Sequence, residues 1–322
     1  MPVWQRWALL AAALCVGAGI AATLAWRRLD APGPLPADRA ITVPAGTTAQ
    51  IGIALTDAEL VARPLELRLA AWATRTEAAL RPGEFAFPAH ASLRQILTIL
   101  RSARHVQHRI TIPEGLTAAQ IARLLDRNDL LDGDLPLPAE GAVLPQTYAF
   151  ERGTQRATLL DRMTAAMDKQ RDDIWINRAP NLPLADAADL VTLASLVERE
   201  TARPEERAHV AAVFFNRLRS GMRLQSDPTI AYVASFGLGS LDHPITRAEL
   251  DNANAYNTYR IAGLPPGPIA SPGLAALLAT AHPIASDDLY FVADGAGGHS
   301  FARTLDDHNR NVARLRAIAV KK

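Results

Sequence analysis

Residues 186–202 have the sequence DAADLVTLASLVERETA, and they set the architecture of the C-terminal half of the chain. Apolar side chains recur in this stretch at helical spacing and define one face that must pack inward: Leu190, Val191, Leu193, Leu196 and Val197. The pattern predicts a helix from Asp186 to Ala202 that lies against a core.

Two carboxyl groups stand near the end of this predicted helix. At about 100° per residue, Glu200 lies roughly 50° from the centre of the apolar face, whereas Glu198 lies roughly 110° from it. We therefore expect Glu200 to point toward the core and Glu198 to lack that setting. A carboxyl held against apolar groups is desolvated in its charged form, so its pKa rises and it can act as a general acid near neutral pH. The alternative for a glutamate at a helix end is a solvated charge or an ion pair.

The neighbouring segments predict a mixed, helix-rich α+β domain over residues 141–322. Prolines and acidic residues from Asp134 to Glu140 mark its beginning. Periodic apolar residues predict further helices at 158–169, 205–219 and 306–320. Residues 289–293 and 300–304 are typical of two strands joined by Gly-Ala-Gly-Gly.

An internal repeat lies upstream of this domain. The segment ITVPAGTTAQI (41–51) recurs, with one insertion, as ITIPEGLTAAQI (110–121). In both copies an alternating strand stops at Pro-x-Gly, and a threonine then caps a short apolar helix. With helices also expected at 65–73 and 92–100, residues 40–140 are predicted to form a small α+β module. Its order of strands and helices resembles LysM-type glycan-binding modules, and the alternative is a spacer domain without a ligand.

The N-terminal residues predict a membrane anchor. The segment from Trp7 to Trp26 is apolar apart from Thr23, and at about 1.5 Å per residue it is long enough to cross a bilayer core. We assign residues 1–28 to a short N-terminal tail and a single transmembrane helix, and the Pro-rich residues 29–39 to an extended spacer. The alternative is a cleaved signal peptide, for which this apolar core is long. The flanking charges leave the orientation open.

The composition of the chain excludes several classes of function. With 34 Lys+Arg against 33 Asp+Glu there is no basic field for phosphates, so no nucleic-acid partner is expected. The single cysteine, Cys15, lies in the predicted span, which excludes thiol chemistry from the remainder of the chain. The 8 histidines show no H-E-x-x-H or similar ligand spacing, so neither a metal nor another cofactor is predicted.

A series of short motifs is more specific than any of these features. In chain order they are ASLVERET (194–201), VFFNRL (213–218), GMRLQSDPT (221–229), AYNTY (255–259), GLPPGPIASPG (263–273) and YFVADGAGGHSF (290–301). This ordered set resembles the MltG (YceG-like) endolytic murein transglycosylases, from about Ile110 onward and in the N-terminal anchor. The catalytic glutamate of that family falls in the Glu-x-Glu-Thr motif, whose second glutamate is Glu200 here. One departure is Gln146, where the family usually has an acid, so an acidic role there is in doubt.

The resemblance implies a lyase that cuts MurNAc-GlcNAc bonds within peptidoglycan glycan strands without water and so ends the elongation of nascent strands. One carboxyl would protonate the leaving oxygen and then, as a carboxylate, remove the proton of the sugar's own C6 hydroxyl, which closes a 1,6-anhydro ring. The resemblance also implies a catalytic domain on the periplasmic side of the cytoplasmic (inner) membrane and a cytoplasmic N-terminus. Peptidoglycan synthases are then candidate partners.

Several residues besides Glu200 are candidate substrate contacts, because sugar hydroxyls and N-acetyl groups bind amides, carboxylates and aromatic faces. They are Gln225, Asp227, Tyr256, Asn257, Tyr259 and His299. Asp227 is also the main alternative carboxylate, or simply part of a turn or helix cap. Two other functions stay open at this point: a non-catalytic, membrane-tethered peptidoglycan-binding scaffold and, more distantly, a metallohydrolase.

Overall fold

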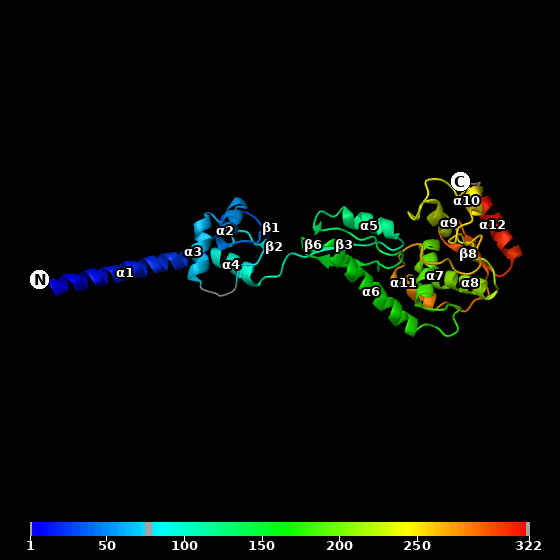
Figure 1. Cartoon of the computed structure of the whole chain (residues 1–322), viewed down its shortest axis with the longest axis horizontal. Coiled ribbons are helices and arrows are strands. Elements are labelled where there is room, and N and C mark those ends of the chain that lie inside the picture. Colours follow the sequence, from blue (N-terminus) through cyan, green and yellow to red (C-terminus); the bar gives the residue numbers. More distant parts are fainter. Residues whose placement is uncertain (1, 75–78, 320–322) are drawn as a thin grey trace. The chain divides into compact units, whose positions relative to one another are not determined.

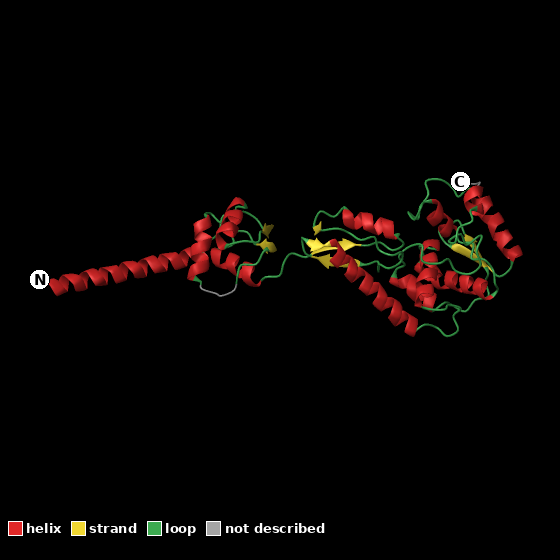
Figure 2. Cartoon of the chain, in the orientation of Figure 1, coloured by secondary structure: helices red, strands yellow, loops and turns green. Residues whose placement is uncertain are grey.

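The computed structural model describes residues 2–74 and 79–319. The chain forms two compact units, residues 1–108 and 109–322 (Figure 1). Helices make up most of the regular structure in both units, and the strands pair only two at a time (Figure 2). The predicted α+β class is therefore confirmed. Each unit has a hydrophobic core of its own.

The first unit contains a strand-helix-helix-strand sequence between two further helices. Its elements are α1 (Val3–Asp30), β1 (Arg39–Val43), α2 (Thr48–Asp57), α3 (Pro64–Ala73), β2 (Gly83–Phe87) and α4 (Leu93–Ser102). β1 and β2 are antiparallel, with Ile41 opposite Phe85. Both of these side chains lie in the core, which the helices complete. Strand β2 was not predicted, because its 5 residues include Glu84, a buried charge that obscures the pattern.

Helix α1 contains the segment that the sequence assigns to a membrane. Within the described residues, Ala12–Asp30 is the one stretch that is long and apolar enough to cross a bilayer. Its large apolar side chains, such as Leu14 and Ile20, are exposed to the surroundings. A signal sequence shares these properties, so α1 is a candidate anchor by length and composition.

Residues 29–39 do not form the extended spacer that their prolines predict. Leu29 and Leu35 are 6% and 1% exposed and belong to the core of the first unit. The His90 N–H donates to the Leu35 carbonyl at 2.8 Å, and the Gly33 N–H donates to the His90 carbonyl at 3.1 Å. Prolines restrict their own backbone but do not keep a neighbouring leucine out of a core. The folded unit therefore begins at the end of α1 and not near Ala40.

The division between the units also differs from the predicted boundary near residue 140, because it lies between His108 and Arg109. Ile110 and Ile121, from the second copy of the repeat, share a core with Tyr148 of the following segment. Residues 109–140 are therefore part of the second unit. Hydrophobic contacts made across the chain determine the boundary, and the prolines at 134–140 lie in a loop within the unit.

The local structure of the repeat is nevertheless as predicted in both copies. Thr47 and Thr117 are N-caps, and each forms a capping box with a glutamine three residues later, Gln50 and Gln120. Each box satisfies backbone N–H groups that the first helical turn leaves without partners. The two copies thus share a cap and a short helix but belong to different units.

The second unit has a small β-rich end and a larger helical part. Its strands are β3 (His108–Thr111), β4 (Leu131–Asp132), β5 (Thr147–Phe150), β6 (Thr154–Gln155), β7 (Tyr290–Ala293) and β8 (His299–Ala302). Its helices are α5 (Ala118–Asp126), α6 (Arg156–Ile176), α7 (Ala187–Glu200), the 3-10 turn η1 (Pro204–Glu206), α8 (Arg207–Arg219), α9 (Asp227–Ala234), α10 (Arg247–Asp251), α11 (Leu274–Ala281) and α12 (Leu305–Ala319). β3 pairs with β5, and β7 with β8 forms the predicted hairpin.

Helix α7 is the central helix of the second unit. Every residue from Leu190 to Val197 is buried, because α6, α8, α9 and α11 all contact this helix. The sequence predicted one inward face, whereas the structure buries the whole circumference. Thr201 has extended backbone angles, φ −137° and ψ 133°, so the helix ends at Glu200. The last side chain of α7 therefore emerges from the middle of the core.

Candidate active site

Glu200 lies at the C-terminal end of α7, where the buried helix opens onto a cleft of about 480 Å³. The carboxylate accepts a hydrogen bond from the Ser226 hydroxyl at 2.5 Å. Burial raises the pKa of Glu200 to about 7, against the lowering effect of the Ser226 hydroxyl and with a further rise from the nearby charge of Asp227. A carboxyl with this pKa exchanges its proton near neutral pH, as a general acid and base must.

Three of the predicted substrate contacts line the same cleft, two from the start of α9 and one from the loop that follows α10. They are Gln225, Asp227 and Tyr259. The Tyr259 hydroxyl donates to the Asp227 carboxylate at 2.5 Å, and burial raises the pKa of that hydroxyl. Gln225 has a φ of +48°, in the left-handed region that few residues adopt without a constraint. The constraint here includes its N–H, which donates to the Thr258 carbonyl at 3.2 Å.

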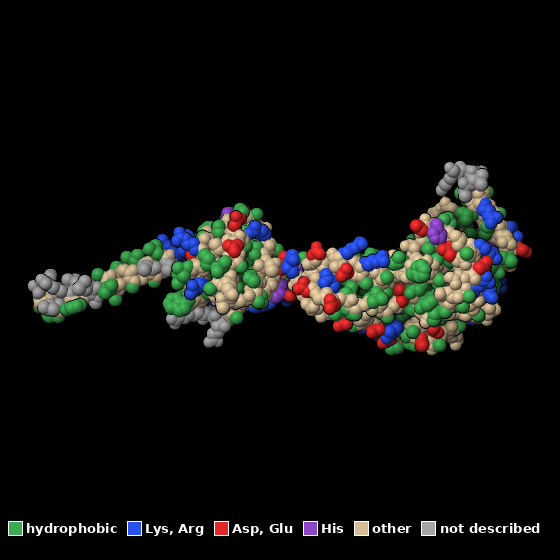
Figure 3. Space-filling view, turned by 45° about the horizontal axis from the view of Figure 1, so that its top comes forward, with side chains coloured by type: hydrophobic (Ala, Val, Ile, Leu, Met, Phe, Trp, Pro, Cys, Tyr) green, Lys and Arg blue, Asp and Glu red, His purple; other side chains and the backbone are tan. Residues whose placement is uncertain are grey.

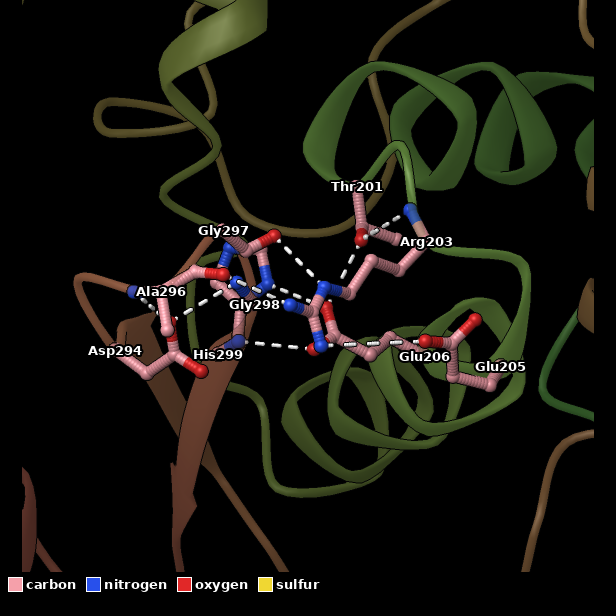
Figure 4. Close-up of polar contacts among 9 residues, drawn as sticks. All are labelled: Thr201, Arg203, Glu205, Glu206, Asp294, Ala296, Gly297, Gly298 and His299. Carbon is pink, nitrogen blue, oxygen red and sulfur yellow. Dashed lines mark hydrogen bonds and ion pairs between the residues drawn. The ribbon is translucent and has the colours of Figure 1, made fainter.

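His299 lines the cleft from the β7–β8 hairpin, and a glutamate orients its ring (Figure 4). Glu206 accepts from the His299 backbone N–H at 2.9 Å and lies 2.7 Å from the ring Nδ1. A carboxylate is an acceptor, so Nδ1 carries a proton in this contact. The same carboxylate accepts from the Thr201 hydroxyl at 2.9 Å, next to Glu200 in the chain. Burial acts to raise the pKa of Glu206, but the hydrogen bonds from His299 and Thr201 outweigh it and lower the pKa.

The glycine-rich turn of this hairpin is held in place by Arg203 (Figure 4). The guanidinium donates to the carbonyls of Gly297 at 2.9 Å and Ala296 at 2.8 Å. Asp294 accepts from the backbone N–H groups of Ala296 and Gly298 across the same turn. The turn is thereby tied to the segment that follows α7, which fixes His299 relative to Glu200.

Two predicted contacts do not reach the cleft. The Asn257 side chain is buried, and it donates to the carbonyls of Leu250 and Asn252 and accepts from the Tyr259 N–H. Its amide is thus fully used in shaping the loop that carries Tyr259. Tyr256 packs against Tyr232, with ring centroids 5.2 Å apart, among the apolar residues of the helical core. Both residues therefore lie outside the lining of the cleft and belong to the structure that supports it.

Glu198 does not have the exposed setting that its angle on the helix suggests. Its side chain is 6% exposed and lies 3.0 Å from the guanidinium of Arg207, which is itself 8% exposed. Its second oxygen accepts from the Gly273 N–H at 2.9 Å. Burial raises the pKa of Glu198, and the hydrogen bond from Gly273 and the charge of Arg207 oppose that rise. The prediction from the helical face was wrong here because Arg207 and the backbone at Gly273 cover the Glu198 side chain, and only the neighbouring Arg199 is exposed at this level of α7.

Three further residues complete the site and were not among the predicted contacts: Ser226, Glu206 and Arg217. Arg217 lines the cleft and donates to the carbonyls of Leu289 and Leu224, both at 2.7 Å. Burial lowers the pKa of Arg217, while the carboxylate of Glu200 acts in the opposite direction. Ser226 and Arg217 lie within the motifs quoted above, so the signal existed. What was missing was the contact across the fold that gives each residue its role.

The cleft can therefore bind a polar ligand and exchange one proton with it. Glu200 offers a carboxyl with a pKa of about 7, Asp227 a second carboxylate, and Tyr259 and Tyr290 aromatic faces. Within residues 2–74 and 79–319, no three His, Cys, Asp or Glu side chains are grouped as metal ligands would be.

Residues 41–314, which include the cleft and most of both units, match the YceG-like family. The chain therefore belongs to this family. Among its relatives, an endolytic murein transglycosylase from Streptococcus pneumoniae is 38% identical over 202 residues, which cover 61% of this chain and 35% of the relative. The endolytic murein transglycosylase of Bacillus subtilis is 35% identical over 185 residues, 57% of this chain and 49% of the relative. The chain thus spans less than half of either relative.

A solved structure extends the likeness over most of the chain. The crystal structure of a YceG-like protein from Listeria monocytogenes has 27% sequence identity and a TM-score of 0.52. The alignment covers 85% of this chain and 98% of that chain.

Proposed function

We propose that this protein is an endolytic murein transglycosylase that cleaves the MurNAc-GlcNAc bond of peptidoglycan without water. The observation that carries the proposal is Glu200, a carboxyl at the end of a buried helix that opens onto a cleft and has a pKa of about 7. The named activity of the relatives from Streptococcus pneumoniae and Bacillus subtilis supports the same reaction.

Glu200 begins the reaction protonated. Its proton passes to the oxygen that joins MurNAc C1 to GlcNAc, the C1–O bond breaks, and GlcNAc leaves with a free hydroxyl. The resulting carboxylate takes the proton of the MurNAc C6 hydroxyl, whose oxygen bonds to C1 and closes the 1,6-anhydro ring. Glu200 is then protonated again and no water is consumed. Because the nucleophile belongs to the substrate, its effective concentration is high and no protein nucleophile is needed.

The residues around Glu200 have supporting roles in this proposal. The Asp227 carboxylate stabilises positive charge as it develops at C1, and the Tyr259 hydroxyl fixes its orientation. His299 is held by Glu206 through Nδ1, so the ring nitrogen that it offers to the N-acetyl or hydroxyl groups of the sugar is Nε2. Gln225 provides an amide for the same groups.

The first unit places this activity at the membrane in our proposal. We infer that α1 is retained as an anchor in the cytoplasmic membrane, with the N-terminus cytoplasmic and both folded units on the periplasmic side. The β1-α2-α3-β2 module is proposed to bind glycan as LysM-type modules do, and peptidoglycan synthases are proposed neighbours of the enzyme. An alkaline phosphatase fused after residue 322 should be active in cells, and an inactive fusion would contradict this orientation.

The function is tested with uncrosslinked glycan strands and the full-length protein in detergent. An endolytic enzyme shortens long strands to intermediate lengths early in the digest, whereas a non-catalytic scaffold binds strands and leaves their lengths unchanged. Glu200→Gln is the matched control, because it keeps the size of the side chain but cannot transfer the proton. Strand shortening by the native protein alone is the expected result, and unchanged strand lengths with both proteins would favour the scaffold.

A further inference from the structure

An apolar surface of the first unit lies outside its core, on helix α3. Leu65, Leu69 and Trp72 follow one another at helical spacing and are 55%, 56% and 68% exposed. The opposite side of α3 carries Leu67 and Ala70, which are buried. The helix is therefore apolar on its outer side as well as its inner side, although ordinary surface helices have a polar outer face.

This outer side of α3 continues into the last turns of α1. Leu69 and Trp72, together with Ala22 and Trp26 of α1, line an apolar groove of about 420 Å³. Ala22 and Trp26 belong to the stretch Ala12–Asp30 that is long and apolar enough to span a bilayer. Helix α3 thus lies beside the end of the candidate span.

The charges around this groove suit a lipid surface. The nearby acidic side chains are paired, since Glu66 lies 3.4 Å from Arg28 and Asp30 lies 2.6 Å from Arg94. Arg27 and Arg68 are exposed beside the apolar residues. Arginine side chains gather where α1 meets the rest of the unit, and apolar side chains follow α1 (Figure 3). Apolar side chains flanked by cations are the pattern of helices that lie in the interface of a membrane with anionic lipids.

We propose that the outer side of α3 docks into the lipid headgroup region of the same membrane that α1 spans. The occupant of the groove is lipid, because Trp26 and Leu69 line one continuous apolar surface and part of that surface belongs to the span itself. Docking at two helices fixes how the first unit is oriented on the bilayer, which a single helix cannot do. The inference rests on the proposed membrane anchor.

The test uses fluorescent labels on the full-length protein in vesicles of phosphatidylcholine and phosphatidylglycerol. The single native cysteine, Cys15, reports on α1. In a Cys15→Ala background, Leu69→Cys reports on the groove. Ile53→Cys is the matched control, because Ile53 on α2 is an apolar residue with similar exposure, 53%, that does not line the groove. Each cysteine carries an environment-sensitive dye and is exposed in turn to iodide in water and to lipids with a nitroxide quencher, which is shallow for residues 53 and 69 and near the bilayer centre for Cys15, because Cys15 lies inside the candidate span.

Docking predicts that the nitroxide lipid quenches the label at residue 69 but not at residue 53, and that iodide does the reverse. Equal quenching of both labels by iodide would overturn the inference. A residue-69 label that neither quencher reaches would also overturn it, since a second copy or another protein would then cover the groove. If lipid quenches the label at Cys15 but not at residue 69, α1 is an anchor and only the docking fails. If lipid fails to quench at Cys15, the anchor itself is wrong.

Discussion

Glu198 and Glu200 are two residues apart on one helix, but they lie in two different regions of the second unit. Glu198 points into a closed ion pair with Arg207 and the backbone N–H of Gly273. Glu200 lines an open cleft, and one of its oxygens accepts a hydrogen bond from the Ser226 hydroxyl. Burial raises the pKa of both carboxyls. A raised pKa is therefore insufficient to identify the acid, and access to a ligand distinguishes the two residues.

The difference between the two glutamates is tested most directly by replacing each of them with glutamine. Glu200→Gln removes the proton donor but keeps the shape of the side chain, so turnover should fall about 10²- to 10⁴-fold, the range for general acid-base catalysis. The fold should persist, because a neutral side chain suits this buried position. Rates of strand cleavage and thermal unfolding curves check both expectations. Full activity of Glu200→Gln would show that another carboxyl, with Asp227 the first alternative, supplies the proton.

The pH dependence of the activity should follow the protonation of Glu200, the carboxyl in the cleft. The proposed mechanism requires Glu200 to be protonated in the free enzyme, and the pKa of Glu200 is about 7. Activity should therefore be level below that pH on this limb and fall about tenfold for each pH unit above it. Initial rates of strand cleavage between pH 5 and 9 at subsaturating substrate measure this limb. A flat profile from pH 6 to 9 would contradict the assignment.

The next largest loss of turnover is expected when the hydrogen bonds that orient His299 are weakened. Glu206→Gln replaces an acceptor that serves both the His299 backbone and its ring, so the ring loses a charge-assisted hydrogen bond. A loss of about 10- to 100-fold in turnover is expected from bonds of this strength. Glu205→Gln is the matched control, since the neighbouring Glu205 side chain is 68% exposed. A role limited to folding would lower the melting temperature of Glu206→Gln without a separate loss of turnover in the folded enzyme.

Glu198→Gln should affect stability rather than chemistry. The substitution leaves the buried Arg207 with less compensation, and the loss of a charged hydrogen bond should lower the free energy of unfolding by about 1–3 kcal/mol. Turnover below the melting temperature should stay within about tenfold of the native value, far above that of Glu200→Gln. Urea unfolding and cleavage rates measured on the same samples separate the two effects. A Glu198 variant as inactive as the Glu200 variant would remove the distinction between the two regions.

Ser226→Ala is expected to have the smallest effect on activity. It tests whether the pKa of Glu200 alone sets the pH profile. The Ser226 hydroxyl donates to the Glu200 carboxylate and lowers its pKa. Without that hydroxyl the pKa rises further, so the alkaline limb of the pH profile should move to higher pH. The limb of Glu198→Gln should stay in place. A shift of the Ser226→Ala limb to lower pH would contradict the role given to this hydrogen bond.

Local sequence patterns predicted those parts of the molecule whose structure is local. The helix that carries Glu200, the β7–β8 hairpin and the threonine caps at Thr47 and Thr117 each depend on a few neighbouring residues. Helix α11 was missed, because its sequence LAALLATA offers no polar side for a periodic pattern to reveal. The spacer and the domain boundary were wrong because burial of Leu35 and Ile110 depends on partners elsewhere in the chain.

The site was predictable to a similar extent. Glu200 could be selected from its place on the helix and from its motif, and Gln225, Asp227, Tyr259 and His299 do line its cleft. The contact between Glu206 and His299 joins residues 93 positions apart, and no local pattern predicts such a pairing. Asn257 has the right chemistry for a sugar contact, but the loop backbone uses its amide completely.

The most direct test of the reaction is the chemistry of the new strand ends. Purified glycan strands are digested with the full-length protein in water enriched in ¹⁸O, and the products are weighed by mass spectrometry. Attack by the C6 hydroxyl predicts 1,6-anhydro-MurNAc ends, which are one water lighter than hydrolytic ends and contain no ¹⁸O. Glu200→Gln should yield almost none of these ends. Reducing MurNAc ends that carry ¹⁸O would show that water is the nucleophile and would contradict the transglycosylase mechanism.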